Sequence, residues 1–177
     1  MNVVRKEEIF TIKDIYGLPE GERAELIDGQ IYYMAPPNTG HQRLVNYFCT
    51  EINLYIRKNG GLCEVFPSPF AVFLNKNDKN YVEPDISIVC EPSKLDDKGC
   101  HGAPDWIIEI VSPSSRQMDY YKKLFKYRSA GVREYWVVDP DREVVTVYNF
   151  EADTMMEYPF GEEVPAGIYE GFFVKAQ

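Results

Sequence analysis

Two acidic side chains and one amine lie where the sequence is otherwise apolar or helical. Asp85 lies in YVEPDISIVC and Glu109 in PDWIIEIVSPSS, two short apolar runs, and Lys123 lies in SRQMDYYKKLFKYRSAG, which has the pattern of an amphipathic helix. Carboxylates on neighbouring buried strands must either become neutral or hold a cation, because unpaired buried charge is costly. The three residues therefore predict a metal site.

The strand pattern around Glu109 predicts that this carboxylate is buried. Alternate residues of a strand share a face, so Glu109 points the same way as Ile107 and Val111. Burial raises the pKa of a carboxyl group unless a cation or a donor lies nearby. Pro84 cannot donate to a ladder, so we expect Asp85 to begin the paired part of its strand. The alternative is that each carboxylate accepts hydrogen bonds from the backbone or a tyrosine in a turn.

Lys123 belongs to a stripe on its predicted helix. Asp119, Lys123 and Tyr127 recur at every fourth residue and so share one face. The simplest interpretation is a solvated Asp–Lys pair, which is worth only a few tenths of a kcal/mol. What distinguishes Lys123 is its place directly after the strand that carries Glu109.

The elements that would position these groups alternate between helix and strand. AELIDGQIYYM predicts a hairpin around Asp28-Gly29, and the apolar spacing predicts a helix from Asn38 or Thr39 to about Lys58. A helical turn is expected at 11–17, strands at 63–74, 82–90, 106–111, 135–138 and 144–148, a helix at about 115–130 capped by Ser114 or Ser115, and a short strand in the tail. A strand, a helix and a strand in that order indicate a crossover within a mixed sheet, hence an α/β fold.

Composition and charge limit the class of protein. The 177 residues are 45% hydrophobic, which suits one folded domain spanning residues 1–177. The net charge of −9 argues against a broad phosphate-binding surface, because nucleic-acid affinity comes largely from Lys and Arg. No stretch is apolar enough to span a membrane, and MNVVRKEEIF does not look like a secretion signal, so we expect a cytoplasmic protein.

The four cysteines show no C-x-x-C spacing. In a cytoplasmic protein we therefore expect Cys49, Cys63, Cys90 and Cys100 to be reduced thiols. Cys100-His101 is a pair of potential zinc ligands, but without a second pair of ligands it is a weak zinc signal.

Several separated motifs together resemble one known family. PDWIIEIVSPSS, the stripe that follows it, GVREYWVVDP, AELIDGQIYYMAPPNTGHQ and EPDISIVC are similar to the Uma-two family of restriction-endonuclease-like proteins. That family belongs to the wider PD-(D/E)xK nuclease-like superfamily. The resemblance spans roughly residues 20 to 172, with the motifs in the same order and spacing.

The resemblance implies a restriction-endonuclease-like core, in which a mixed central sheet is flanked by helices, and a Mg²⁺ (or Mn²⁺) site. Asp85 and Glu109 would be the metal-binding carboxylates, with the backbone carbonyl of Ile110 as a third ligand. The superfamily lysine usually lies two positions after the acid, which here is Val111. Lys123 on the next helix becomes the candidate catalytic lysine. Glu25 and His41 match early family positions, and with Asp119 and Tyr127 they are supporting candidates; alternatively, His41 is only a polar residue at a helix end.

Two functions of different classes follow from the sequence. The first is a metal-dependent phosphodiesterase acting on DNA, expected as a homodimer, in which Lys123→Ala keeps the fold but loses cleavage. The second is a catalytically inactive accessory module that retained the nuclease fold, which the charge of −9 favours. A metal-independent binder of small molecules that uses the many tyrosines is a third interpretation.

Overall fold

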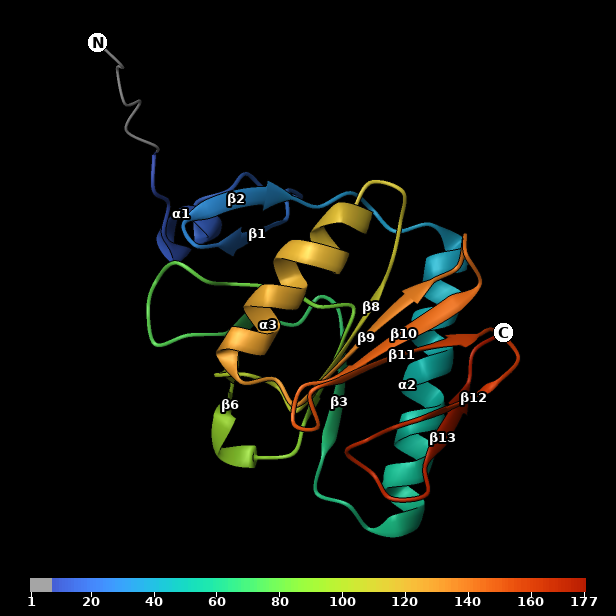
Figure 1. The fold of residues 1–177 in the computed structure, drawn as a ribbon. Helices are drawn as coiled ribbons and strands as arrows, with labels where there is room; N and C mark the ends of the chain where they lie inside the picture. Colours follow the sequence, from blue (N-terminus) through green and yellow to red (C-terminus); the bar gives the residue numbers. More distant parts are fainter. Residues whose placement is uncertain (1–7) are drawn as a thin grey trace.

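The central element is a six-stranded sheet with helices on both faces (Figure 1). The computed structural model describes residues 8–177. The strand order is β11 (Thr154–Pro159), β10 (Val144–Asn149), β9 (Glu134–Asp139), β8 (Trp106–Ile110), β5 (Ile86–Val89) and β3 (Glu64–Pro67). Strands β8 and β9 are parallel, and the other neighbours are antiparallel. The predicted mixed sheet and α/β fold are confirmed.

Helix α2 (Thr39–Asn59) covers one face of this sheet (Figure 1). The Asn38 side chain caps it by accepting from the His41 amide at 2.9 Å, and Gly60 ends it in the left-handed region with φ +68°. The apolar stripe packs against the sheet residues Trp106 and Trp136. This helix forms within one residue of the predicted limits because both caps and the stripe agree.

The other face carries the predicted crossover helix. A π-helical turn, η2 (Met118–Lys123), continues into α3 (Leu124–Ala130), and the buried Tyr127 packs beside Tyr135. The sequence predicted a regular helix capped by Ser114 or Ser115, which is wrong in its cap. The capping oxygen is Ser112 Oγ, which accepts from the Ser115 amide at 3.2 Å.

The remaining elements lie around the edges of the sheet. The described residues add α1 (Ile12–Tyr16), the hairpin β1 (Ala24–Ile27) and β2 (Gln30–Tyr33), a small sheet of β4 (Val72–Phe73), β6 (Leu95–Asp96) and β7 (Gly99–His101), the short helix η1 (Pro92–Lys94), and the pair β12 (Glu163–Pro165) and β13 (Phe173–Lys175). The hairpin turn uses positive φ at Asp28 and Gly29, as predicted. The tail supplies more than the one short strand expected, since β11 is a full edge strand.

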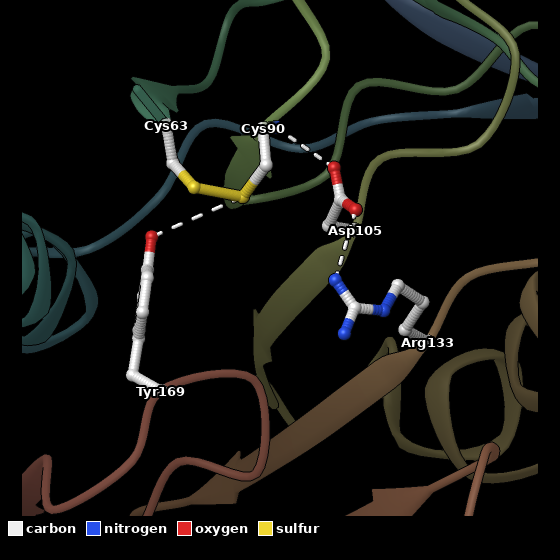
Figure 2. Close-up of a disulfide and its surroundings, with 5 residues drawn as sticks. All are labelled: Cys63, Cys90, Asp105, Arg133 and Tyr169. Atoms are coloured by element: carbon white, nitrogen blue, oxygen red, sulfur yellow. Dashed lines mark hydrogen bonds and ion pairs between the residues drawn. A yellow bond between two sulfur atoms is a disulfide. The ribbon is translucent and has the colours of Figure 1, made fainter. Parts of the chain in front are cut away.

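Two of the four cysteines form a disulfide, so the expectation of four reduced thiols is wrong for Cys63 and Cys90 (Figure 2). The β3–β5 register pairs Glu64 with Val89, which places the two cysteines opposite each other one step further along. Their spacing in the chain could not reveal this pairing. The Cys90 amide donates to Asp105 Oδ2 at 2.7 Å, which ties the disulfide to the start of β8.

Glu134 is a buried carboxyl group at the start of β9, remote from the sequence-predicted site. Burial raises its pKa to about 7, although Trp136 Nε1 donates to Oε1. The folded protein therefore holds a proton that the unfolded chain has released, and stability falls as pH rises from about 4.5 to about 7. We expect Glu134→Gln to remove this loss.

Urea unfolding of the wild type and of Glu134→Gln at pH 5 and pH 8 measures that effect. Wild type should lose unfolding free energy between pH 5 and pH 8, whereas Glu134→Gln should not. The difference in unfolding free energy between variant and wild type should therefore grow by about 2 kcal/mol over this range. Glu162→Gln, at an exposed carboxylate, is the matched control. A stability difference between Glu134→Gln and wild type that does not change with pH would contradict the assignment.

Within residues 8–177, every helix is too short or too polar to cross a bilayer. The expectation about a secretion signal concerns in part residues 1–7, which lie outside the described residues. A cytoplasmic location stays a prediction.

Candidate functional site

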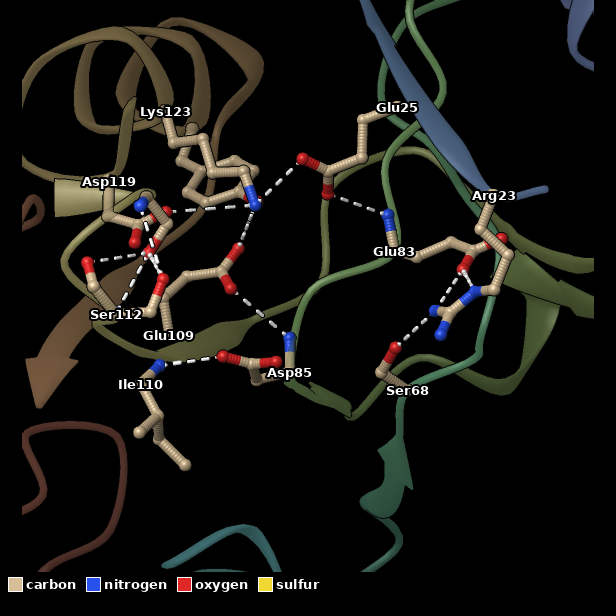
Figure 3. Close-up of polar contacts among 12 residues, drawn as sticks. Arg23, Glu25, Ser68, Glu83, Asp85, Glu109, Ile110, Ser112, Asp119 and Lys123 are labelled. Carbon is tan, nitrogen blue, oxygen red and sulfur yellow. Dashed lines mark hydrogen bonds and ion pairs between the residues drawn. The ribbon is translucent and has the colours of Figure 1, made fainter. Parts of the chain in front are cut away.

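The two candidate metal-binding carboxylates are linked directly through the backbone (Figure 3). Asp85 lies immediately before β5, and its Oδ2 accepts from the Ile110 amide at 2.7 Å. In return, the Asp85 amide approaches Glu109 Oε2 at 3.3 Å. The backbone pairing of β5 and β8 ends at Ile86 and Ile108. Beyond that point the side chains of Asp85 and Glu109 accept the backbone hydrogen bonds that the neighbouring strand no longer accepts. The structure thus brings Asp85, Glu109 and Ile110 together.

The Ile110 carbonyl faces the same side as the Asp85 side chain. In a strand, the N–H and C=O of one residue point the same way, and the Ile110 N–H points at Asp85. The β5–β8 register, continued, would place Pro84 opposite Ile110, and proline has no N–H to offer a carbonyl. The carbonyl oxygen of Ile110 is therefore directed toward Asp85 and His41.

Lys123 is buried among carboxylates, which contradicts the interpretation as a solvated pair. Its Nζ lies 2.8 Å from Glu25 Oε2, 2.9 Å from Glu109 Oε1 and 3.8 Å from Asp119 Oδ1 (Figure 3). Only 6% of its side chain is exposed. Glu25 also accepts from the Glu83 amide at 3.0 Å, which connects the hairpin to the segment that leads into β5.

Tyr127 and Asp119 complete the helix stripe as the sequence predicted. Tyr127 donates its hydroxyl to Glu109 Oε1 at 2.7 Å, and both residues are buried. The Tyr135 hydroxyl donates to the Asp119 carbonyl at 3.1 Å. The alternative in which the carboxylates accept backbone and tyrosine hydrogen bonds is therefore also present in the geometry.

His41 reaches the site from the first turn of α2. Its Nε2 lies 3.0 Å from Asp85 Oδ2, so it is more than a polar residue at a helix end. Its Nδ1 is buried and has no hydrogen-bond partner among residues 8–177. Burial acts to lower the pKa of His41, but Asp85 outweighs it and the pKa is raised.

The site holds more carboxyl groups than cations. Burial raises the pKa of Glu109 well above its usual value, opposed by Lys123. Burial also raises the pKa of Asp119 to about 6. For Lys123, burial acts to lower the pKa, but the surrounding carboxylates outweigh it and the pKa is raised. The ammonium is therefore charged, and the carboxyl groups are crowded around it.

The cluster lines an open pocket of about 1210 Å³. Asp85, with 16% of its side chain exposed, lies at the pocket wall, whereas Glu109, at 4%, lies at its base. The pocket lies between the β2–α2 connection and the Ser112–Ser115 turn, which in Figure 1 approach the same end of the sheet. Solvent can therefore reach the cluster at Asp85, whereas Lys123 is buried behind it.

The donor set fits a hard divalent cation. Asp85 Oδ2 is occupied by its two donors, but no hydrogen bond from residues 8–177 engages Oδ1. Carboxylate and carbonyl oxygens are the ligands Mg²⁺ prefers, and it binds through one or two carboxylates while keeping waters. Within the described part of the chain, no group of three or more His, Cys, Asp or Glu side chains has metal-binding geometry. The oxygens that lie together here are those of Asp85, Glu109 and the Ile110 backbone.

Sequence reasoning missed a second ion pair on the pocket wall. Arg23 binds Glu83 Oε2 through Nε at 3.0 Å and Ser68 Oγ through Nη2 at 2.8 Å (Figure 3). The Tyr81 hydroxyl donates to the other oxygen of Glu83 at 2.7 Å. The alternation of side chains along a strand could have predicted this pair. Arg23 lies two residues before Glu25, and Glu83 lies two residues before Asp85, so each shares a face with a candidate acid.

Comparisons with known proteins agree with this fold. A solved structure from Anabaena variabilis, described as a putative nuclease belonging to DUF820, matches with a TM-score of 0.73 at 23% identity over 90% of both chains. The uncharacterized protein slr1290 of Synechocystis is 28% identical over 137 residues, which cover 75% of this chain and 68% of that protein. Residues 9–172 match the Uma2 model, which is described as a putative restriction endonuclease. The chain has a nuclease-like fold and belongs to the Uma2 family.

Proposed function

We propose that this protein is a Mg²⁺- or Mn²⁺-dependent nuclease that hydrolyses phosphodiester bonds in DNA. The observation that carries the proposal is the link between Asp85, Glu109 and the Ile110 backbone at the base of an open pocket. The family match and the nuclease-like fold support it. Asp85, Glu109 and the Ile110 carbonyl would hold the metal.

The bound metal would polarise a phosphoryl oxygen and lower the pKa of a bound water. In the hydrolysis itself, the oxygen of a water would form a bond to phosphorus while one P–O ester bond breaks. One proton of that water would pass to the leaving oxygen, giving a phosphate monoester and an alcohol. Lys123 fixes Glu109 at 2.9 Å and, from its buried position behind that carboxylate, would offset negative charge that develops beside it. His41 positions Asp85, and Glu25, Asp119 and Tyr127 position Lys123 and Glu109.

Metal binding and cleavage test the proposal separately. Titration of Mg²⁺ or Mn²⁺ into the wild-type protein by calorimetry should give binding that Asp85→Ala loses. Plasmid and single-stranded DNA should be cut with the metal and left intact with EDTA. Asp96→Ala, which removes an exposed carboxylate that faces His101, is the control. Unchanged metal binding in Asp85→Ala would refute the site.

A second candidate function is an accessory module that retains the nuclease fold without catalysis. Two observations favour it: Lys123 is enclosed by three carboxylates, and the net charge of the chain is −9. Such a module would fold and show no metal-dependent cleavage in the assays above.

We also propose that residues 1–177 act as one domain, because helices on both faces share one sheet. The homodimer expected with the nuclease hypothesis is part of the proposal, and light scattering after size-exclusion chromatography measures it.

A further inference from the structure

Charge on the pocket wall limits how many phosphates the site can hold. Carboxylates line it in greater number than cations: Glu25, Glu83, Asp85, Glu109, Asp119, Asp141 and Glu143 against Arg23, Arg43 and Lys123. Arg23 is paired with Glu83, and Lys123 is buried among its acids. A protein that holds a long duplex makes on the order of 6–10 phosphate contacts with Lys and Arg.

Arg43 is the exception among these cations. It is exposed on α2, two residues after His41, and makes no ion pair or side-chain hydrogen bond among residues 8–177. Its guanidinium therefore has no partner in the described chain that would account for its place on the pocket. It offers the pocket one guanidinium for one phosphate group.

Tyr33 provides an unused aromatic surface on the same pocket. It ends β2, and 67% of it is exposed. Within the described chain, its ring stacks on no other aromatic ring and its hydroxyl makes no hydrogen bond, whereas the adjacent Tyr32 contacts Lys122. Exposed aromatic rings beside a few cations are how proteins bind unpaired strands, because every base has a face on which to stack.

We propose that the pocket binds an unpaired DNA strand a few nucleotides long, with a base stacked on Tyr33 and a phosphate on Arg43. This inference rests on the proposed nuclease function. The volume of about 1210 Å³ exceeds the roughly 300–1,000 Å³ usual for small-molecule pockets, which suits a short strand segment. A duplex offers its phosphates outside and its bases stacked inside, so only its two ends have a base face that Tyr33 could contact.

Fluorescence anisotropy tests the inference with a labelled single-stranded oligonucleotide and the blunt duplex of the same sequence, each in Ca²⁺. The single strand should bind more tightly than the duplex at equal salt. Tyr33→Ala should weaken single-strand binding about tenfold, and Tyr33→Phe should retain it. Tyr121→Ala, at an equally exposed tyrosine outside this pocket, is the matched control.

Arg43→Ala should weaken single-strand binding and reduce the slope of log K against log salt by about one. Arg57→Ala, at an exposed arginine near the other end of α2, should change neither. Equal binding of strand and duplex, or an unaffected Tyr33→Ala, overturns the inference even if the wild type cleaves DNA. A preference for the single strand that depends on Tyr33 supports the inference even if the protein does not cleave DNA. The failure of the single-strand inference can therefore be told apart from the failure of the proposed nuclease function.

Discussion

Replacing Glu109 with glutamine is expected to reduce DNA cleavage by roughly 100-fold or more and to weaken divalent-metal binding. Glutamine has the shape of glutamate, so its carbonyl oxygen can still accept from Tyr127 and Lys123, and only the 3.3 Å contact from the Asp85 amide loses its acceptor. What it loses is the negative charge that would hold the metal next to Asp85. The fold should therefore persist while the chemistry is lost.

The measurement is single-turnover cleavage of plasmid in Mg²⁺, together with metal titration and far-UV circular dichroism of the same samples. Glu143→Gln makes the identical chemical change at an exposed carboxylate of the pocket rim and should leave cleavage within about twofold of wild type. A Glu109→Gln protein that binds metal and cuts DNA like wild type would show that the carboxylate is structural only.

Removing the ammonium of Lys123 is expected to cost about 3–5 kcal/mol of unfolding free energy. Methionine fills a similar volume but leaves the carboxylates of Glu25, Glu109 and Asp119 without their cation. From the sequence, Lys123→Ala is expected to keep the fold and lose only cleavage. The burial of the Lys123 side chain changes that expectation, because its removal should also destabilise the fold. Urea unfolding at fixed pH measures the loss.

The control for this prediction lies one residue away. Lys122 is exposed and rests on the Tyr32 ring, so Lys122→Met should cost less than about 1 kcal/mol. Adding Glu25→Gln to Lys123→Met should restore part of the stability, because one unpaired charge is removed. If both lysine variants lose the same stability, Lys123 does not hold the cluster together.

Local patterns predicted the main elements well. Helix α2 has a capping asparagine, an apolar stripe that recurs at three and four residues, and a terminal glycine, and it forms where these signals place it. The alternation along β8 correctly separated Ile107 and Glu109 from Trp106 on the opposite face. Each of these features depends on residues close together in the chain.

Features that depend on pairing between distant segments could not be obtained in this way. The disulfide of Cys63 and Cys90 depends on the β3–β5 register, and β6 and β7 are too short to show a period. Burial of Lys123 likewise needs Glu25 from the hairpin, which only the tertiary fold brings near. The family resemblance named Glu25 as a candidate, but the contact itself comes from the structure.

The π-helical turn from Met118 to Lys123 has a consequence for how the length of this segment can vary. In a regular α-helix, side chains four residues apart drift around the axis by about 40° at each step. One wider turn rotates the stripe back, which keeps Lys123 and Tyr127 on the same oxygen of Glu109 and Asp119 beside the Lys123 ammonium. Deleting a single residue there would swing the amine out of register with the phenol, so any homologue that is shorter by one at this point must build its centre differently.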